Sequence, residues 1–389
     1  MLLALNLSIH IETYDDEEHE EHEELTSILE TLSLSCPVVK IVSFDIHLTG
    51  RNVESLMPLL SRTICRFEGA DRLAIPSPID EVALRHLAIS PRFTQLVLSA
   101  RQSQIEKLSL SRSDIPFSGA KIINLFELDL GSITSLLRPE GQMFFCTEFH
   151  LAVPPTPQLT LSFLTALASC PRLSSLQSII LDRERANPHI WPEVHQDLQE
   201  ELLDDNHILS RDILQPLISF HNLRELSVDM NNPISLNDEE LVNLVRGWPL
   251  LRFLRLVPGN GLSTKYSTLR GLLLLVAVCP NLERVDLRVE AREIPTSGVG
   301  MDIRSDTVKE LNFPGSPIND PPLVAMFLSI RFPSIILLLG PPYKWEPYAE
   351  EWVQVRDYVY LIRRIKSRLQ RSHNALDIAH HIFSFVASD

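Results

Sequence analysis

The sequence of 389 residues predicts an α/β fold built from repeated strand–helix units, and three observations lead to that prediction. A short phrase recurs, as CPNLERVDL at residues 279–287, WPLLRFLRL at 248–256 and, less closely, FHNLRELSV at 220–228 and FPSIILLLG at 332–340. The anchor residues Leu223, Leu251, Leu282, Val308 and Ile335 lie 28, 31, 26 and 27 residues apart. An apolar segment with helical patterning precedes two of these phrases.

A spacing of this size is the long leucine-rich-repeat period of one strand and one helix. In such a solenoid each repeat buries its apolar edge against its neighbours, so the core grows in one dimension and one domain can be long. We therefore expect a horseshoe over residues 1–344, with a parallel sheet on its concave face and helices on its convex face. The N-terminal half is expected to be irregular, because its anchor spacings scatter from 12 to 47.

Each predicted strand carries apolar residues at offsets 0, 3 and 5 of the phrase, which we expect to point into the core. Since a triplet already begins at Leu2, the chain is expected to open inside the array. Phe93 and Ile105 are only 12 residues apart, so one of these two units is expected to be false or connected by a turn. The full set of triplets begins at Leu2, Val39, Ala70, Phe93, Ile105, Leu125, Cys146, Leu176, Leu223, Leu251, Leu282 and Val308, and the series closes with Ile335 and Leu338.

Helix signals and insertions complete the predicted organisation. Asn237 and the three acids after it predict a helix start, and Pro321 with Pro322 predicts another. Residues 12–24 include eight acids in ten positions and are expected to form a solvated insertion, and residues 182–212 a second, longer one.

From residue 345 the pattern changes to a C-terminal helical region, 345–389. Trp352, Val355, Val359 and Ile362 form one apolar stripe, which we expect to cover the end of the last repeat. The basic end of this helix leaves two alternatives open, a helix that binds a partner and a helix that lies on an anionic membrane surface.

The composition and the sequence patterns argue against several classes of protein. A net charge of −15 argues against a nucleic-acid binder. The opening residues lack a signal-peptide pattern, and the longest apolar run, 271–279, is too short to span a bilayer. The five cysteines are odd in number and lack paired spacing, which favours reduced thiols and a cytoplasmic or nuclear protein.

The predicted site lies on the concave sheet, where strand alternation should direct offsets 2, 4 and 6. This surface carries mixed charges and an occasional aromatic residue. We expect it to bind a protein, with the arginines and Phe253 as the strongest contributors to the affinity. Glu127, Asp129, Glu148 and His150 would extend this surface towards the N-terminus. Its main members are Glu225, Ser227, Asp229, Phe253, Arg255, Arg284, Asp286, Arg288, Glu310 and Asn312.

Motifs for catalysis, phosphate binding and metal binding are absent from the sequence, so we expect no enzyme, no cofactor and no metal. His19 and His22 lie in the acidic insertion without a third ligand, and adjacent His380 and His381 would diverge on a helix. Two alternatives remain open. One is a hydrolase or modifying enzyme in the N-terminal half, with Glu148 and His150 as its pair, and the other is a truncated gene product.

The phrases CPNLERVDL, WPLLRFLRL and SCPRLSSL resemble the repeat region of fungal F-box/leucine-rich-repeat proteins over most of residues 39–340. The resemblance implies a substrate receptor of an SCF ubiquitin ligase, in which an F-box binds Skp1 and the repeats bind the target. An N-terminal F-box is not visible here. The tail ALDIAHHIFSFV, residues 375–386, is similar to a first F-box helix but lacks its leading proline. Skp1 and cullin are therefore partners that the resemblance implies only if an F-box is present.

Overall fold

The computed structural model describes residues 4–11, 27–28, 31, 39–48, 53–67, 69–99, 122–128, 131, 134, 146–151, 156–170, 176–183, 208–230, 232–257, 265–298, 300–339 and 348–371. The chain divides into two compact units. The first comprises Met1–Leu236 and Asn243–Lys265, and the second comprises Asn237–Val242 and Tyr266–Asp389. Both units have an α/β architecture based on parallel strands.

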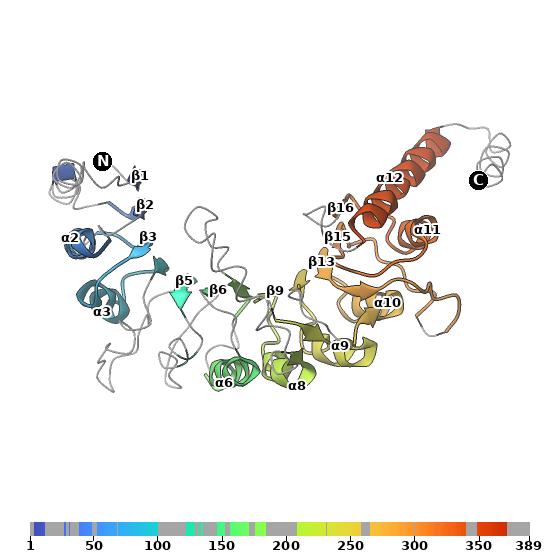
Figure 1. The fold of residues 1–389 in the computed structure, drawn as a ribbon, viewed down its shortest axis with the longest axis horizontal. Helices are drawn as coiled ribbons and strands as arrows, with labels where there is room; N and C mark the ends of the chain where they lie inside the picture. The colour runs from blue at the N-terminus through green and yellow to red at the C-terminus, as the bar shows by residue number, and fades with distance from the viewer. Residues whose placement is uncertain are drawn as a thin grey trace. The chain divides into compact units, whose positions relative to one another are not determined.

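The first unit contains one parallel sheet whose strands are neighbours in chain order (Figure 1). Every strand pairs parallel with the next, as expected when a crossover segment returns the chain to the same edge before each new strand. The strands are β1 (Ala4–Ile11), β2 (Ile41–Leu48), β3 (Arg72–Pro78), β4 (Gln95–Ser99), β5 (Ile122–Leu128), β6 (Cys146–Leu151), β7 (Ser178–Arg183), β9 (Glu225–Asp229) and β11 (Phe253–Leu256).

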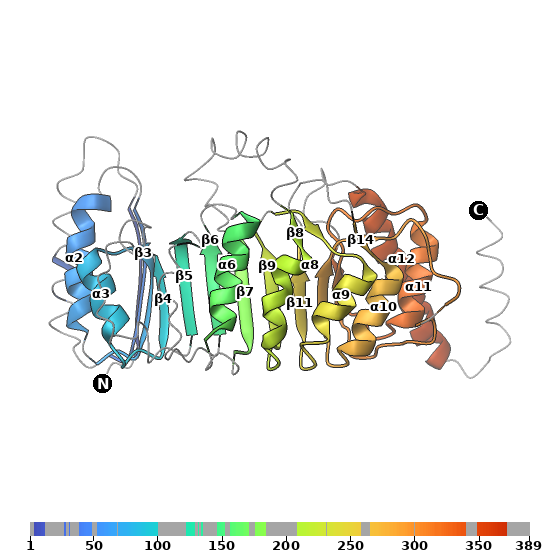
Figure 2. The same ribbon diagram turned by 90° about the horizontal axis from the view of Figure 1, so that it is seen from below.

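Helices of the first unit lie along one side of this sheet (Figure 2). They are α2 (Val53–Arg66), α3 (Glu81–Ile89), α6 (Pro157–Ala168), α8 (Arg211–Leu214) and the 3₁₀ helix η3 (Gln215–Ser219). Asp80 and Thr156 cap α3 and α6, because their side-chain oxygens accept hydrogen bonds from Ala83 N and Leu159 N. A short sheet of β8 (Leu209–Ser210) and β10 (Ile234–Ser235) joins the crossovers.

The core of the first unit lies between the sheet and these helices, and it is made by the predicted apolar triplets. Leu223, Leu226 and Val228 are buried, and so are the equivalent residues of the other triplets that the structure describes with their side chains. The predicted core pattern is confirmed for these residues. The remaining fully described triplets of this unit are Ala70, Leu73 and Ile75; Phe93, Leu96 and Leu98; Leu176, Ile179 and Leu181; and Leu251, Leu254 and Leu256.

Trp248 closes the helix side of this core at the end of a crossover. Its indole is 1% exposed, and Nε1 donates a hydrogen bond to Leu217 O at 2.8 Å. The preceding Gly247 approaches η3 so closely that a Cβ there would lie 2.8 Å from Ile218 O. A side chain at 247 would therefore push the crossover away from η3.

The second unit has its own parallel sheet, of β13 (Arg284–Leu287), β15 (Glu310–Asn312) and β16 (Leu337–Leu339). Helices α10 (Leu269–Val278) and α11 (Pro321–Arg331) lie on one side of it (Figure 1). A short pair, β12 (Ser267–Thr268) with β14 (Val289–Glu290), runs parallel beside them. The core again consists of the predicted triplets, Leu282, Val285 and Leu287 with Val308, Leu311 and Phe313.

Two predicted helix starts are confirmed. Helix α9 (Asp238–Val245) begins in the second unit with a capping box, in which Asn237 Oδ1 accepts from Glu240 N and Glu240 Oε2 accepts from Asn237 N, both at 2.9 Å. Asp238 then accepts two hydrogen bonds from Thr268, which in turn caps α10. Helix α11 begins at the predicted Pro321, with Asp320 as its cap.

The predicted C-terminal helix is α12 (Ala349–Arg371), which packs on α11. Trp352, Val355 and Val359 of the predicted stripe are buried, and the Trp352 ring lies 4.8 Å from that of Phe313. Two of the basic side chains hold the helix in place, since Arg363 donates to Ile335 O and Lys366 donates to Ser329 O. The charged groups of Arg363 and Lys366 are therefore used in contacts within the unit.

Cys170 and Cys279 fill the apolar slot before a proline and are both buried, as predicted. Cys36, the acidic insertion 12–24, most of the insertion 182–212 and the tail 372–389 lie outside the described residues. The C-terminal end of the second insertion, from Leu209, belongs to the folded first unit. Among the described helices, none combines the length and the apolar character that crossing a bilayer would require.

Burial raises the pKa of the Cys279 thiol from 9.0 to about 12, because the thiolate would lose its hydration. We expect iodoacetamide at pH 8 to label Cys279 roughly a thousandfold more slowly in the folded chain than in urea, since three pKa units reduce the thiolate fraction by that factor. Peptide mass spectrometry of a labelling time course measures both rates. Equal rates in the two conditions would contradict the burial of this thiol.

Candidate functional site

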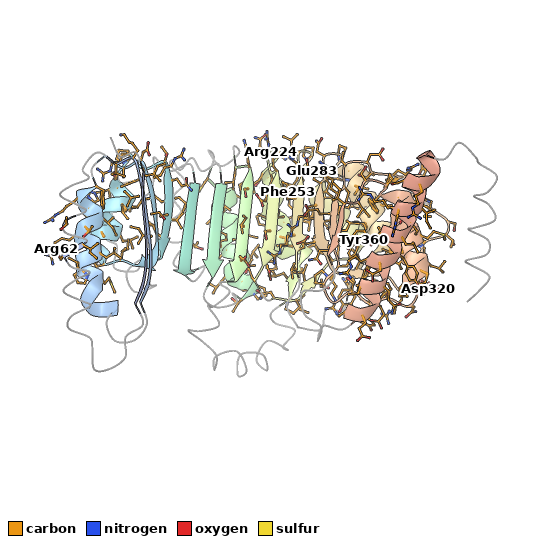
Figure 3. All side chains as sticks on the ribbon, turned by 90° about the horizontal axis from the view of Figure 1, so that it is seen from above. Arg62, Arg224, Phe253, Glu283, Asp320 and Tyr360 are labelled. Carbon is orange, nitrogen blue, oxygen red and sulfur yellow. The ribbon has the colours of Figure 1, made fainter. Side chains whose placement is uncertain are left out.

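Each unit presents polar side chains on the side of its sheet opposite the helices. We call the set in the first unit the first polar face, and it comprises Glu225, Ser227, Asp229, Phe253 and Arg255. We call the set in the second unit the second polar face, and it comprises Arg284, Asp286, Arg288, Glu310 and Asn312. In β11, Leu254 and Leu256 are buried on the helix side, whereas Phe253 and Arg255 alternate with them and are half-buried. Phe253 is labelled in Figure 3, and the Arg252 guanidinium lies 5.6 Å from its ring. The predicted alternation of offsets therefore holds in this strand.

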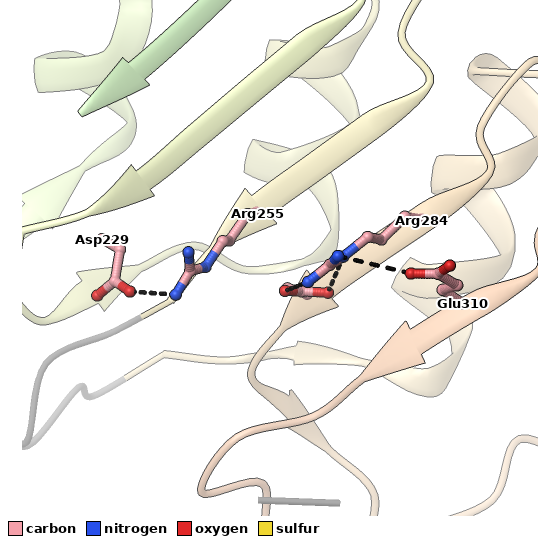
Figure 4. Close-up of polar contacts among 5 residues, drawn as sticks. Asp229, Arg255, Arg284 and Glu310 are labelled. Carbon is pink, nitrogen blue, oxygen red and sulfur yellow. Dashed lines mark hydrogen bonds and ion pairs between the residues drawn. The ribbon is translucent and has the colours of Figure 1, made fainter. Parts of the chain in front are cut away.

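The first polar face is organised by an ion pair across neighbouring strands. Arg255 Nη2 of β11 donates to Asp229 Oδ2 at the end of β9 (Figure 4). Glu225, also on β9, accepts a hydrogen bond from Ser178 Oγ of β7 at 3.0 Å. Asp229 and Glu225 thus each have a partner within the unit.

Ser227 belongs to the same predicted set, but only 7% of its surface is exposed. In the strand register it lies between Ile180 of β7 and Arg255 of β11, whose longer side chains flank it. Its Oγ has no hydrogen-bond partner among the described residues. Ser227 therefore lies beneath its neighbours on this face, and a partner would contact the longer side chains around it.

The second polar face centres on Arg284, which bridges two carboxylates. Its Nε donates to Asp286 Oδ1 at 3.1 Å and its Nη2 donates to Asp286 Oδ2 at 2.9 Å, a bidentate geometry (Figure 4). Its Nη1 lies 3.5 Å from Glu310 Oε2 on β15. Asp286 is only 2% exposed, so this predicted contact residue is likewise buried and serves to hold Arg284.

Arg288 has a different environment, although it follows Arg284 and Asp286 on the same side of the strand. Its guanidinium lies over the Tyr266 ring, 4.6 Å from the centroid. Glu290 is a nearby carboxylate, but Arg292 donates to it through the backbone N at 3.0 Å and through Nε at 2.9 Å. These hydrogen bonds from Arg292, with a smaller contribution from Arg288, lower the pKa of the Glu290 carboxyl.

Asn312 completes the second polar face, opposite Asp286 in the pairing of β15 with β13. Its Oδ1 atom is buried and has no hydrogen-bond partner among the described residues. Tyr266 was not predicted as a site residue. It precedes β12, outside the repeated phrase, and so the offset rule gives no signal for it.

The N-terminal extension of the predicted surface can be placed only by its backbone. Glu127 lies in β5, and Glu148 and His150 lie in β6, where they face Ile180 and Asp182 of β7 in register. Their side chains lie outside the description, as do Asp129, His19, His22, His380 and His381. Across the described part of the chain, no group of three or more His, Cys, Asp or Glu residues could hold a metal ion.

The first polar face carries a half-buried aromatic ring, and each face carries arginines held in defined positions. Arginine and aromatic side chains dominate the energy of many protein–protein contacts, because they bury a large area and lose little entropy when they are already fixed. No protein-family model matches the sequence, and a comparison with curated proteins finds no significant match.

Proposed function

We propose that this chain is a non-enzymatic leucine-rich-repeat protein that binds a protein partner on the polar side of its strands. The observation that carries the proposal is the organised set of side chains opposite the helices, with Arg255, Arg284 and Arg288 each fixed by a carboxylate or a ring. Fixed side chains lose less conformational entropy on binding than free ones, which favours recognition.

The repeat architecture supports the same proposal. In each unit, parallel strands follow one another in chain order, and buried residues recur at offsets 0, 3 and 5. A leucine-rich-repeat solenoid has this pattern, and it leaves one side of the strands available for a partner. The division into a concave sheet and a convex layer of helices is part of this proposal.

The resemblance to F-box/leucine-rich-repeat proteins extends the proposal to a substrate-recognition arm of an SCF ubiquitin ligase. Affinity purification of the tagged full chain, followed by mass spectrometry, tests this extension directly. Recovery of Skp1 and cullin together is the expected result for a ligase subunit. Recovery of a partner without either protein would leave the chain as an interaction scaffold outside that ligase.

Phe253→Ala is the substitution that tests binding on the first polar face, since it removes the aromatic side chain without breaking an ion pair. We expect it to weaken the captured partner's affinity roughly tenfold, the lower range for an anchoring aromatic residue. Binding of the purified partner is measured by calorimetry. Arg255 and Arg284 are poorer targets, because their loss would leave the carboxylates of Asp229 and Asp286 without these partners.

Val82→Ala provides the matched control for this experiment. Val82 is 73% exposed on α3, on the helix side of the same unit, and should tolerate truncation. Its affinity should equal that of the unmodified chain. If Val82→Ala weakens binding and Phe253→Ala does not, the partner binds the helix side and the proposal fails.

A further inference from the structure

The three arginines of the polar faces differ in how their charge is used. Arg255 is paired with Asp229, and Arg284 is paired with both Asp286 and Glu310. Arg288 makes no ion pair with any carboxylate among the described residues, and its buried Nε also has no hydrogen-bond partner there. A guanidinium without a carboxylate partner among the described residues is a feature that a binding partner can complete.

The position of Arg288 is nonetheless fixed. The Tyr266 ring supports one face of the guanidinium at 4.6 Å. On the chain after β15, Gly315 has a φ of +58°, and a Cβ at this residue would lie 3.8 Å from both Cζ and Nε of Arg288. Because glycine is the residue that adopts this conformation readily, the chain passes the guanidinium here without a side chain that could cover it.

We propose that Arg288 binds a carboxylate of the partner protein, from an aspartate or a glutamate side chain. The inference rests on the proposed function, because it names the chemistry by which the second polar face recognises that partner. A planar guanidinium held on a ring presents parallel N–H donors, which match the two oxygens of a carboxylate. The acceptor comes from the partner, since Asp286 is engaged by Arg284 and Glu290 by Arg292.

The surrounding charges favour a singly charged carboxylate over a phosphate. Glu290, Asp286 and Glu310 all belong to the same unit, and Arg284 and Arg292 together offset only two of these three negative charges. A dianion would meet repulsion from these groups and from a chain with a net charge of −15. The single charge of Arg288, which has no ion pair among the described residues, therefore fits one carboxylate.

Arg288→Gln is the first test, with the partner identified by affinity purification and then purified. It removes the charge and the forked donors, and we expect the dissociation constant to rise about thirtyfold or more, as for a hot-spot residue. Tyr266→Leu removes the ring under the guanidinium and should raise the dissociation constant about fivefold. Arg270→Gln is the matched control, because Arg270 is exposed on α10 on the helix side, and it should leave the affinity unchanged.

Arg288→Lys permits a second test that does not depend on affinity. A water-soluble carbodiimide activates a carboxylate, and a neighbouring amine then forms an amide bond while the carbodiimide leaves as its urea. We expect mass spectrometry of the treated complex to find a cross-link from position 288 to an aspartate or glutamate of the partner. The circular dichroism spectrum and the thermal midpoint of each variant establish that it is folded.

The outcomes separate this inference from the proposed function. If Phe253→Ala weakens binding but Arg288→Gln does not, and position 288 cross-links only to this chain's own carboxylates, the inference is overturned and the proposed function stands. If neither substitution weakens binding, or no protein is captured, the proposed function fails and the inference fails with it. A thirtyfold loss of affinity in Arg288→Gln, together with a cross-link from Arg288→Lys to the partner, supports both the inference and the proposed function.

Discussion

Trp248→Ala is expected to lower the free energy of unfolding by about 3–5 kcal/mol, the range for deleting a large buried aromatic side chain. The indole is 1% exposed and fills the space between its crossover and η3. Alanine would leave a cavity there and would also leave Leu217 O without its indole donor. Urea denaturation followed by circular dichroism measures the change.

Two companion substitutions separate the causes of this loss. Trp248→Phe keeps most of the buried ring but removes the Nε1 donor, so it should cost only about 1–3 kcal/mol. Leu250→Ala removes an apolar side chain that is 41% exposed two residues away and should change stability by less than about 1 kcal/mol. Equal costs for Trp248→Ala and Leu250→Ala would show that Trp248 is not part of the core.

Trp352→Ala is expected to release α12 from the second unit, with a loss of about 3–5 kcal/mol. Trp352 joins the helix to the sheet layer in two ways: its ring packs on Phe313, and its Nε1 donates to Ser316 O at 2.7 Å. Without it, only the smaller buried residues Val355 and Val359 and the hydrogen bonds from the exposed Arg363 and Lys366 to backbone carbonyls remain among the contacts described for this helix. Limited trypsin digestion should then cleave within α12 much faster than in the unmodified chain.

Tyr360→Ala is the control on the same helix, because Tyr360 is 37% exposed and lies outside the buried stripe. Its digestion rate and stability should stay close to those of the unmodified chain. If Tyr360→Ala exposes α12 as strongly as Trp352→Ala, the packing of this helix does not depend on the buried stripe.

The core could be predicted from the sequence because burial of apolar surface imposes a strict pattern. Residues such as Leu226, Leu254 and Val285 recur at fixed offsets, and each must point towards the helices for the strands to pack. The helix starts at Asn237 and Pro321 could also be predicted from the sequence, since capping depends on residues a few positions apart. Both kinds of signal are local in the chain.

The candidate site could be predicted only in part, because its details depend on neighbours that are distant in sequence. Alternation gives the side of the strand on which Ser227 lies, but not that Arg255 of the neighbouring strand lies beside it and helps to bury it. The Tyr266 ring under Arg288 belongs to a crossover segment, where no periodic pattern applies. The difference between Arg255, which has an ion pair, and Arg288, which has none among the described residues, therefore requires the structure.

Hydroxyl-radical footprinting of the chain with its purified partner tests the central claim most directly. Phe253 reports on the polar side of the strands, and Met326, 49% exposed on α11, reports on a helix surface. The account predicts that the partner slows oxidation of Phe253 severalfold and leaves that of Met326 unchanged. Protection of Met326 with unchanged oxidation of Phe253 would contradict it.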